Sequence, residues 1–379
     1  MVLRKLTLRS FRAHSETEVA FGEKVNAVCG PNGAGKTNLL EAIHFACLSK
    51  SFLATNDAYA LRRGDAFFDI TAKFVSAGNS ESTVRVAFVP GEGKRVTVNG
   101  SPLERIAELV GRFPVVVLSP GDHDITSGAP DERRRLIDNI LSQAHPVYFA
   151  DLIAYRRALK QRNALLRQIA ARRASSHDQL NAWTDECVRL GSRIVHRRDK
   201  FILAFSVFLD DAYRTIESVA EKPAIRYKTL VEPDERSDEE NIARRYRERC
   251  VEVADREREQ GRTLAGPHRD EFVMTLDDLE VRRYASQGQH RTFALALKLA
   301  QYFYIQASRE EPPVFLLDDA LDNLDPARRA AILTVLQSDT VGQSLITAAD
   351  VHFFAPGLDI MGRSNRLIRI DAGHVVAPL

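Results

Sequence analysis

The segment Gly30-Pro-Asn-Gly-Ala-Gly-Lys-Thr37 constrains the fold of this chain more than any other feature. It fits the phosphate-binding pattern G-x-x-x-x-G-K-[ST] at every fixed position. The apolar run Lys24–Cys29 predicts a buried strand before it, and the spacing of Lys36–Leu48 predicts a helix after it. A strand, a glycine-rich loop and a helix in this order are the context in which the pattern binds phosphates. The chain is therefore expected to contain an α/β nucleotide-binding core.

The glycine-rich loop suits nucleotide phosphates for physical reasons. Glycines let the backbone curl so that several N–H groups point inward, and the next helix directs the positive end of its dipole at the anion. Lys36 supplies a positive charge for the β and γ oxygens, and the Thr37 hydroxyl is a ligand for Mg²⁺. We expect an ATP–Mg²⁺ site whose loop residues are Gly30, Pro31, Asn32, Gly33, Ala34, Gly35, Lys36, Thr37 and Asn38.

A second element of this site is Val314-Phe-Leu-Leu-Asp-Asp319, which predicts a buried strand that ends in two carboxylates. Asp318 is expected to hold the Mg²⁺ shell, and Asp319 to orient or deprotonate the attacking water. Such a strand is common, so it carries weight only together with the glycine-rich loop. The predicted catalytic residues are Lys36, Asp318 and Asp319, and the predicted metal ligands are Thr37 and Asp318.

A third motif, Ser286-Gln-Gly-Gln289, opens the helix predicted over Gln287–Ser308. Taken alone, it is explained equally well by an ordinary helix N-cap. The order of motifs is more specific, because the glycine-rich loop, S-x-G-Q, the Asp-Asp strand and then Leu321-Asp-Asn-Leu-Asp325 resemble an ABC-type ATPase head. On this resemblance the signature motif is Ser286, Gln287, Gly288 and Gln289, and the D-loop is 321–325.

Composition excludes several classes of protein. The four cysteines lie far apart and form no CxxC pair, so neither a cysteine zinc site nor a disulfide framework is indicated. No apolar run approaches the roughly 18 residues of a membrane span. Residues 1–26 carry no secretory signal pattern. We expect a cytoplasmic protein without a membrane partner.

The chain divides into three parts by its expected secondary structure. Residues 1–130 and 261–379 predict the two parts of one ATPase head, and 131–260 predict a helical insertion. Two heptad seams in the insertion, 152–169 and 183–201, each contain one arginine. They predict either a projecting antiparallel hairpin or two amphipathic helices packed on a core. Expected strands are Val2–Phe11, Val19–Phe21, Lys24–Cys29, Asp69–Phe74, Thr83–Phe88, Arg95–Val98, Val115–Leu118, Ala224–Leu230, Phe272–Leu276, Val314–Leu317 and Ser344–Thr347, and further helices lie after Glu132 and over Pro326–Leu336.

Longer stretches resemble the RecF family of bacterial recombination and repair ATPases, which are related to SMC and Rad50 heads. The chain departs from the family pattern at Leu53, where Arg is usual, at Gly121, where Glu is usual, and in the D-loop. Thr347 stands where a switch histidine would follow its strand, which predicts slow turnover. The resemblance extends from residue 1 to about residue 350, and its segments are Gly33–Ile43, Lys50–Phe52, Leu118–Pro120, Arg133–Asp138, Tyr155–Leu166 and Gly266–Asp270.

The resemblance implies an α/β fold: an ABC-type, SMC/Rad50-like P-loop ATPase head with an inserted helical, partly coiled-coil domain. It implies that two heads sandwich two ATP molecules, with each signature motif facing the γ-phosphate held by the partner's loop, and that Arg12 lies near the nucleotide. ATP would hold the homodimer on DNA, and hydrolysis would release it. Recombination mediator proteins of the same pathway and a place at the bacterial nucleoid follow from the same resemblance.

The uneven charge of the chain bears on DNA contact. Residues 151–200 carry 12 Lys and Arg against 5 Asp and Glu, whereas 232–259 carry 11 acidic against 7 basic residues. Basic helices are most often solvated faces, but phosphate contact is the favoured interpretation in the insertion of a DNA clamp. The surface between two heads is the alternative. The DNA candidates are Arg156, Arg157, Lys160, Arg172 and Arg173; His268 and Arg269 either support the nucleotide site or brace a turn.

Three other functions fit parts of the pattern. An ABC transporter subunit normally carries Leu-Ser-Gly-Gly-Gln and a switch histidine, and this chain has neither. An SMC or Rad50 protein has much longer arms, and a Rad50 hook needs a CxxC pair. A DNA scaffold that binds ATP without hydrolysis is disfavoured by the intact Asp318-Asp319 pair.

Overall fold

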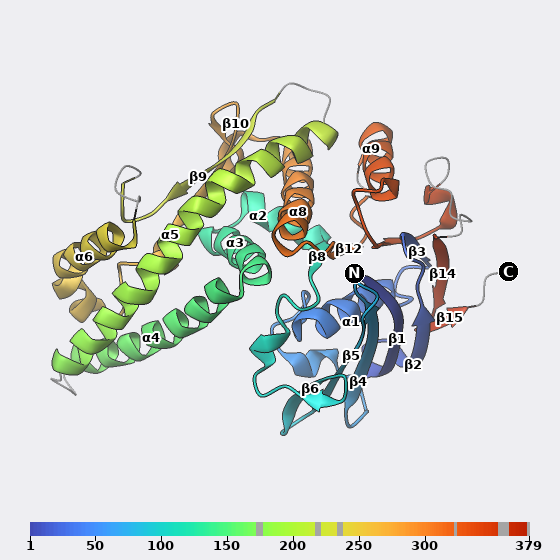
Figure 1. Ribbon diagram of the computed structural model, residues 1–379, viewed down its shortest axis with the longest axis horizontal. Coiled ribbons are helices and arrows are strands. Elements are labelled where there is room, and N and C mark those ends of the chain that lie inside the picture. Colours follow the sequence, from blue (N-terminus) through green and yellow to red (C-terminus); the bar gives the residue numbers. More distant parts are fainter. Residues whose placement is uncertain (172–176, 217–220, 233–237, 322–323, 355–363, 377–379) are drawn as a thin grey trace. The chain divides into compact units, whose positions relative to one another are not determined.

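The computed structural model describes residues 1–171, 177–216, 221–232, 238–321, 324–354 and 364–376 (Figure 1). The chain forms two compact units. The first, which we call the head unit, comprises Met1–Asp122, Ala212–Val219 and Leu295–Leu379. The second, the helical unit, comprises His123–Asp211 and Ala220–Ala294. The division into 1–130, 131–260 and 261–379 remains a proposal about domains.

A mainly parallel sheet forms one layer of the head unit. Its strand order is β15-β14-β3-β13-β12-β8, and only β15 is antiparallel to its neighbour. Every residue of β3, β8, β12 and β13 is buried, as continuous apolar runs in a parallel sheet require. Strand β3 pairs with β13 on one side and with β14 on the other, and Figure 1 shows it beside β14. The bounds are β3 Val25–Cys29, β8 Val115–Leu118, β12 Val314–Leu317, β13 Ser344–Ala348, β14 Arg366–Asp371 and β15 His374–Val376.

An antiparallel sheet forms a second layer of the head unit, in the order β2-β1-β4-β5-β6-β7. Helix α1, Lys36–Leu48, contacts strands of both sheets, among them β1, β4, β8 and β13. Buried residues lie on all sides of this helix. A helix that is covered all round needs no polar face, which explains why its sequence is apolar throughout most of its length. The remaining elements are β1 Val2–Phe11, β2 His14–Ala20, β4 Phe68–Val75, β5 Glu81–Val89, β6 Gly93–Val98, β7 Ser101–Pro102 and α9 Pro326–Gln337.

The helical unit is built around two antiparallel helices, α4 and α5, which lie side by side in Figure 1. Hydrogen bonds join Tyr148 to Arg198 and Arg162 to Thr184. The residue on α4 with the higher number thus contacts the residue on α5 with the lower number, as in an antiparallel pair. A three-stranded sheet, β11-β10-β9, completes the unit. The elements are α2 His123–Ser127, α3 Pro130–Ala144, α4 Pro146–Ala170, β9 Pro223–Lys228, α6 Glu239–Gln260, β10 Glu271–Leu276, β11 Leu279–Glu280 and α7 Val281–Tyr284, while α5, His177–Ile216, and α8, Gln287–Arg309, contribute residues to both units.

The heptad seams of α4 and α5 are real, but the two helices are not a bare hairpin. Helix α6 contacts α4, and Tyr246, Cys250 and Val253 of α6 join Val188 of α5 in a buried cluster. Both sequence interpretations are therefore partly correct, because the antiparallel pair is itself packed on a small core. Among the described residues, no helix is long and apolar enough to cross a membrane.

Several element bounds differ from expectation. The strand expected over Val19–Phe21 is β2, His14–Ala20, which pairs with β1 along its length. The strand expected over Ala224–Leu230 ends at Lys228. Helix α6 and strand β14 had not been expected. The helix lies in the acidic stretch, where charge obscured its apolar stripe, and β14 lies beyond the region of family resemblance.

Candidate nucleotide-binding site

The glycine-rich loop runs from the end of β3 to the start of α1. Gly35 has φ 107°, a conformation that side chains with a Cβ rarely adopt, and it is the N-cap of α1. A Cβ on Gly30 would lie 2.1 Å from the carbonyl oxygen of Ile370 in β14. The loop thus needs glycine at Gly35 for its turn and at Gly30 for close packing against the neighbouring strand.

Lys36 folds back over the loop that precedes it. Its Nζ donates to the carbonyl oxygens of Gly30 (2.8 Å) and Pro31 (3.2 Å), and the residue is only 5% exposed. The ammonium group is therefore held at the loop by backbone acceptors alone, with its positive charge available to an anion. This is the arrangement expected of a lysine that binds phosphate.

The two carboxylates at the end of β12 meet the loop through hydroxyl groups. Thr37 Oγ1 donates to Asp318 Oδ1 (2.9 Å), although β13 separates β12 from β3 in the sheet. Thr347, at the end of β13, lies 2.9 Å from Asp319 Oδ1 and 3.2 Å from Asp318 Oδ1 through its Oγ1. One hydroxyl hydrogen serves one acceptor, so Thr347 donates to a single carboxylate at a time. The residue in the switch-histidine position thus lies within hydrogen-bonding distance of both aspartates and donates to one of them at a time.

Burial raises the pKa of Asp318, and the negative charge of Asp319 raises it further, whereas the hydrogen bond from Thr37 lowers it. A cation beside Asp318 and Asp319 would favour the ionised form of Asp318 and so lower its pKa. Among the described residues, no group of three or more His, Cys, Asp or Glu side chains could hold a metal by itself. Thr37 and Asp318 together offer the two oxygen ligands that Mg²⁺ takes from protein when phosphates supply the others.

Arg12 is paired with a carboxylate of α1. Its Nε and Nη2 donate to both carboxylate oxygens of Glu41 (2.8 and 2.7 Å), a residue of α1 that is fully buried. Ser51 donates to the same carboxylate. Arg12 has φ 53°, and its position next to the nucleotide remains a prediction. Glu41 and Ser51 lie in two segments of the family resemblance, but no local pattern indicates that Glu41 contacts both Arg12 and Ser51.

His14 is a further residue that sequence reasoning missed. Its Nε2 lies 3.1 Å from the carbonyl oxygen of Gly35, and its Nδ1 lies 2.8 Å from that of Gly373, in the turn between β14 and β15. The Gly373 N–H donates to the Ala34 carbonyl (2.8 Å). Burial lowers the pKa of His14. The loop is therefore fixed from outside by one histidine and one strand turn.

The signature motif forms a reciprocal cap at the start of α8. Gln289 N donates to Ser286 Oγ (3.2 Å), and Ser286 N donates to Gln289 Oε1 (2.8 Å). This is a capping box, so the ordinary explanation of the motif is physically present. Ser286 and Gln287 are nonetheless exposed, which leaves the N-terminal end of a long helix open to a ligand.

The other predicted residues have varied positions. Arg156, Arg157 and Lys160 are exposed on α4, and Arg156 pairs with Asp138 (3.1 Å). Arg172 and Arg173 lie outside the described residues, as do positions 322–323 of the D-loop, while Asp325 caps α9.

His268 braces a turn in the helical unit. Its Nε2 lies 3.3 Å from the Thr263 carbonyl oxygen, and its Nδ1 accepts from the Tyr155 hydroxyl (2.7 Å). Burial lowers the pKa of His268 to about 4, so the ring is neutral near pH 7. Both ring nitrogens are therefore occupied within the unit.

Comparisons with known proteins agree with this architecture. The family model described as RecF/RecN/SMC N terminal domain matches residues 2–365. The Smc head domain of Pyrococcus furiosus, 15% identical with a TM-score of 0.56 over 99% of this chain and 95% of that one, shares the fold. The class that fold and motifs define is an ABC-type, SMC-like P-loop ATPase head with a helical insertion.

More similar proteins narrow the assignment. The DNA replication and repair protein RecF of Salinibacter ruber is 50% identical over 98% of this chain and 91% of the relative, and that of Chloroherpeton thalassium is 44% identical over 94% and 96%. A solved structure described as the recombination mediator protein RecF-ATPrS in RecFOR pathway has a TM-score of 0.89 and 28% identity, over 99% of this chain and 97% of that one. The chain belongs to the RecF family.

Proposed function

We propose that this chain is an ATP-dependent DNA-binding clamp of recombinational repair and replication-fork maintenance. ATP drives dimerisation on duplex, gapped or junction DNA, slow hydrolysis releases the clamp, and the bound clamp supports recombinase loading at gaps. The contact between Thr37 and Asp318 carries the proposal, because it joins the phosphate loop to the Asp-Asp strand end in one site. The names of the relatives, which include replication, repair and the RecFOR pathway, support the cellular role.

Within this proposal, the loop and the two carboxylates have separate tasks. Lys36 places its charge on the phosphates, and the loop N–H groups orient them. Mg²⁺, held by Thr37 and Asp318, would neutralise phosphate charge when bound. Asp319 lies next to that pair and is only partly buried, so its carboxylate is accessible to a water molecule. We assign the general base to Asp319 on this ground.

The exposed signature helix supports dimerisation. Ser286 and Gln287 are exposed at the positive end of α8, beside the capping box of Ser286 and Gln289. A second copy that presents its phosphate-bound loop would place negative charge at this end, where a helix dipole favours it. Two such sites would form per dimer, each made by both chains.

Slow, DNA-dependent turnover is the expected kinetic behaviour. Thr347 replaces the switch histidine and is hydrogen-bonded to the carboxylates, so it offers the water no titratable group near neutral pH. DNA contact is proposed for the exposed cations of α4, and recombination mediator proteins of the same pathway are the proposed protein partners. A different SMC/Rad50-like role, or an ATP-binding scaffold without significant turnover, is the competing function.

The decisive experiment measures DNA binding and oligomeric state with and without ATP–Mg²⁺, on gapped, duplex and single-stranded substrates. We expect ATP to convert monomer to dimer in sedimentation and to tighten binding to duplex or gapped DNA. Lys36→Ala should lose nucleotide binding and both effects. A monomer at saturating ATP–Mg²⁺ would contradict the clamp, while absent DNA binding at low salt would refute the repair role and leave the ATPase assignment intact.

A further inference from the structure

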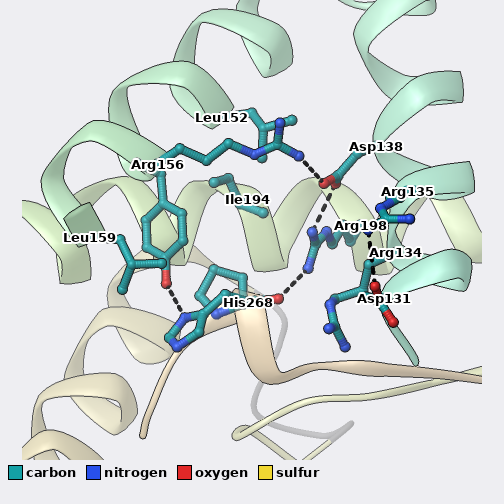
Figure 2. Close-up of a pocket in the computed structure, with 12 residues that line it drawn as sticks. Asp131, Arg134, Arg135, Asp138, Leu152, Arg156, Leu159, Ile194, Arg198 and His268 are labelled. Atoms are coloured by element: carbon teal, nitrogen blue, oxygen red, sulfur yellow. Dashed lines mark hydrogen bonds and ion pairs between the residues drawn. The ribbon is translucent and has the colours of Figure 1, made fainter. Parts of the chain in front are cut away.

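We propose that a pocket in the helical unit binds an acidic peptide segment of a partner protein, through one carboxylate next to one apolar side chain. The pocket has a volume of about 240 Å³ and lies among α3, α4, α5 and the turn at Pro267 (Figure 2). This is enough for one or two side chains, not for a folded domain. It is lined by Asp131, Arg134, Arg135, Asp138, Leu152, Tyr155, Arg156, Leu159, Ile194, Arg198, Pro267 and His268.

The carboxylates of the pocket are already neutralised. Asp138 accepts from Arg198 Nη2 (2.8 Å) and Arg156 Nη2 (3.1 Å), and it also accepts from the Tyr148 hydroxyl. Asp131 pairs with Arg135 (3.1 Å). Figure 2 shows Asp138 between the two arginines that it binds. Neither acidic residue is free to attract a cation.

Arg134 is different, because it forms no close ion pair among the described residues, although the carboxylates of Asp131, Glu271 and Asp270 lie near enough to act on its charge. Its Nη1 donates to the carbonyl oxygen of Asp270 (2.7 Å), and it forms no ion pair with a carboxylate of the described residues. The guanidinium has further N–H groups that a planar carboxylate can accept from in a bidentate manner. Burial, and then the nearby charge of Arg198, lower the pKa of Arg134, whereas the charges of Asp131, Glu271 and Asp270 oppose this shift. A bound anion would offset both effects.

The remaining wall selects for an apolar group beside that anion. Leu152, Leu159, Ile194 and Pro267 line the pocket; Leu159 is half-buried and offers most of the apolar contact, whereas Leu152 and Ile194 are 4% and 0% exposed. His268 adds no charge there, because both of its ring nitrogens are engaged and its pKa is lowered to about 4. One unpaired cation on an apolar wall fits a peptide that carries Asp or Glu beside an aliphatic or aromatic residue.

A nucleic acid fits the same pocket less well. Its bases would need an open aromatic face for stacking, and Tyr155 is 2% exposed with its hydroxyl bound to His268. Its phosphates are better served by cations on open surfaces, such as Arg157 and Lys160 of α4, which do not line the pocket. The occupant is therefore inferred to be a protein segment. This inference depends on neither ATP nor DNA.

The test uses the full chain and an array of blocked hexapeptides, each with one Leu, Ile or Phe next to one Asp or Glu. A matched array carries Asn or Gln instead. We expect the best acidic peptides to bind about tenfold more tightly than their amides, as one charged hydrogen-bonded pair provides. The methyl NMR signal of Ile194 should shift on binding and thereby locate the peptide in the pocket.

Three variants complete the design. Arg134→Gln should abolish the acid preference, Arg134→Lys should restore part of it, and Arg189→Gln, which removes an exposed cation paired with Glu186, should leave it unchanged. An acid preference that survives Arg134→Gln, or equal binding of acids and amides to the wild-type chain, would overturn the proposal. It would equally fail if the Ile194 signal stays in place, or if duplex DNA shifts that signal and displaces the peptide.

Discussion

The hydroxyl of Thr37 lies 2.9 Å from Asp318 Oδ1, although 281 positions separate the two residues in the chain. Thr37 lies in the first turn of α1, which follows β3, and Asp318 follows β12, with β13 between the two strands. Their contact depends on the register of three parallel strands. The spacing of the two ligands is thus set by the sheet rather than by any local segment.

Asp319→Asn should keep nucleotide binding and lose hydrolysis. The variant retains a side chain that can accept from Thr347, but its amide cannot take a proton from water. Loss of a general base typically costs about 100-fold or more in rate. Phosphate release and ATP affinity are to be measured together, with the exposed Asp339→Asn as control. Turnover within a few-fold of wild type would remove Asp319 from the role of base.

The α4 cations predict a specific salt dependence. If Arg157 and Lys160 each contact a phosphate, the double variant Arg157→Gln/Lys160→Gln should lower the slope of log K against log salt by about 1.8. Fluorescence anisotropy with a duplex at several salt concentrations gives this slope. Arg189→Gln, on α5, is the matched control. An unchanged slope would place the DNA surface elsewhere, such as between two heads.

The buried pair of Arg162 and Glu257 should be essential for the helical unit. Their side chains are 5% and 1% exposed, the shortest N···O distance is 2.6 Å, and Arg162 also donates to two threonines. Glu257→Gln leaves a buried guanidinium without its counter-charge, which costs about 3 to 5 kcal/mol. The only tryptophan, Trp183, lies on α5 and reports unfolding of this unit in urea. Glu186→Gln, at an exposed pair, should cost less than about 1 kcal/mol.

Acid should destabilise the helical unit through His268. Its pKa is about 4 in the folded chain against 6.5 for the free side chain, so between these values the unfolded state binds more protons. Stability is therefore complete above pH 6.5 and falls by up to about 1.4 kcal/mol per pH unit as the pH drops toward 4. Urea titrations followed by Trp183 fluorescence at several pH values measure the slope. His268→Gln should reduce it, and an identical slope in this variant would contradict the assignment.

The parts of the fold that could be predicted are those with strong local signals. β8 and β12 are continuous apolar runs, α1 follows a glycine-rich loop, and their bounds agree with expectation. Helix α6 also carries a local signal, since Ile242, Tyr246 and Cys250 follow one another at four-residue spacing and are all buried. High charge on the remaining surface concealed it.

The rest of the site could not be read locally. The pairing of Arg12 with Glu41, and the contacts of His14 with Gly35 and Gly373, join residues far apart in sequence and leave no periodic trace. The charges that line the pocket could not be assigned from the sequence either. Among the described residues, Arg134 lacks an ion pair because Asp131 and Asp138 pair with other arginines, and these pairs are visible only in the structure. Such assignments require the tertiary structure.

The position of β3 between β13 and β14 also has a consequence for synthesis on the ribosome. Residues 25–29 are made first, but their neighbours at 344–348 and 366–371 follow only after roughly 15 to 70 s at ordinary elongation rates. Throughout that interval the apolar strand β3 lacks both of its hydrogen-bonding partners, β13 and β14. The nascent chain is therefore expected to need chaperone protection, and ATP can stabilise only the finished head.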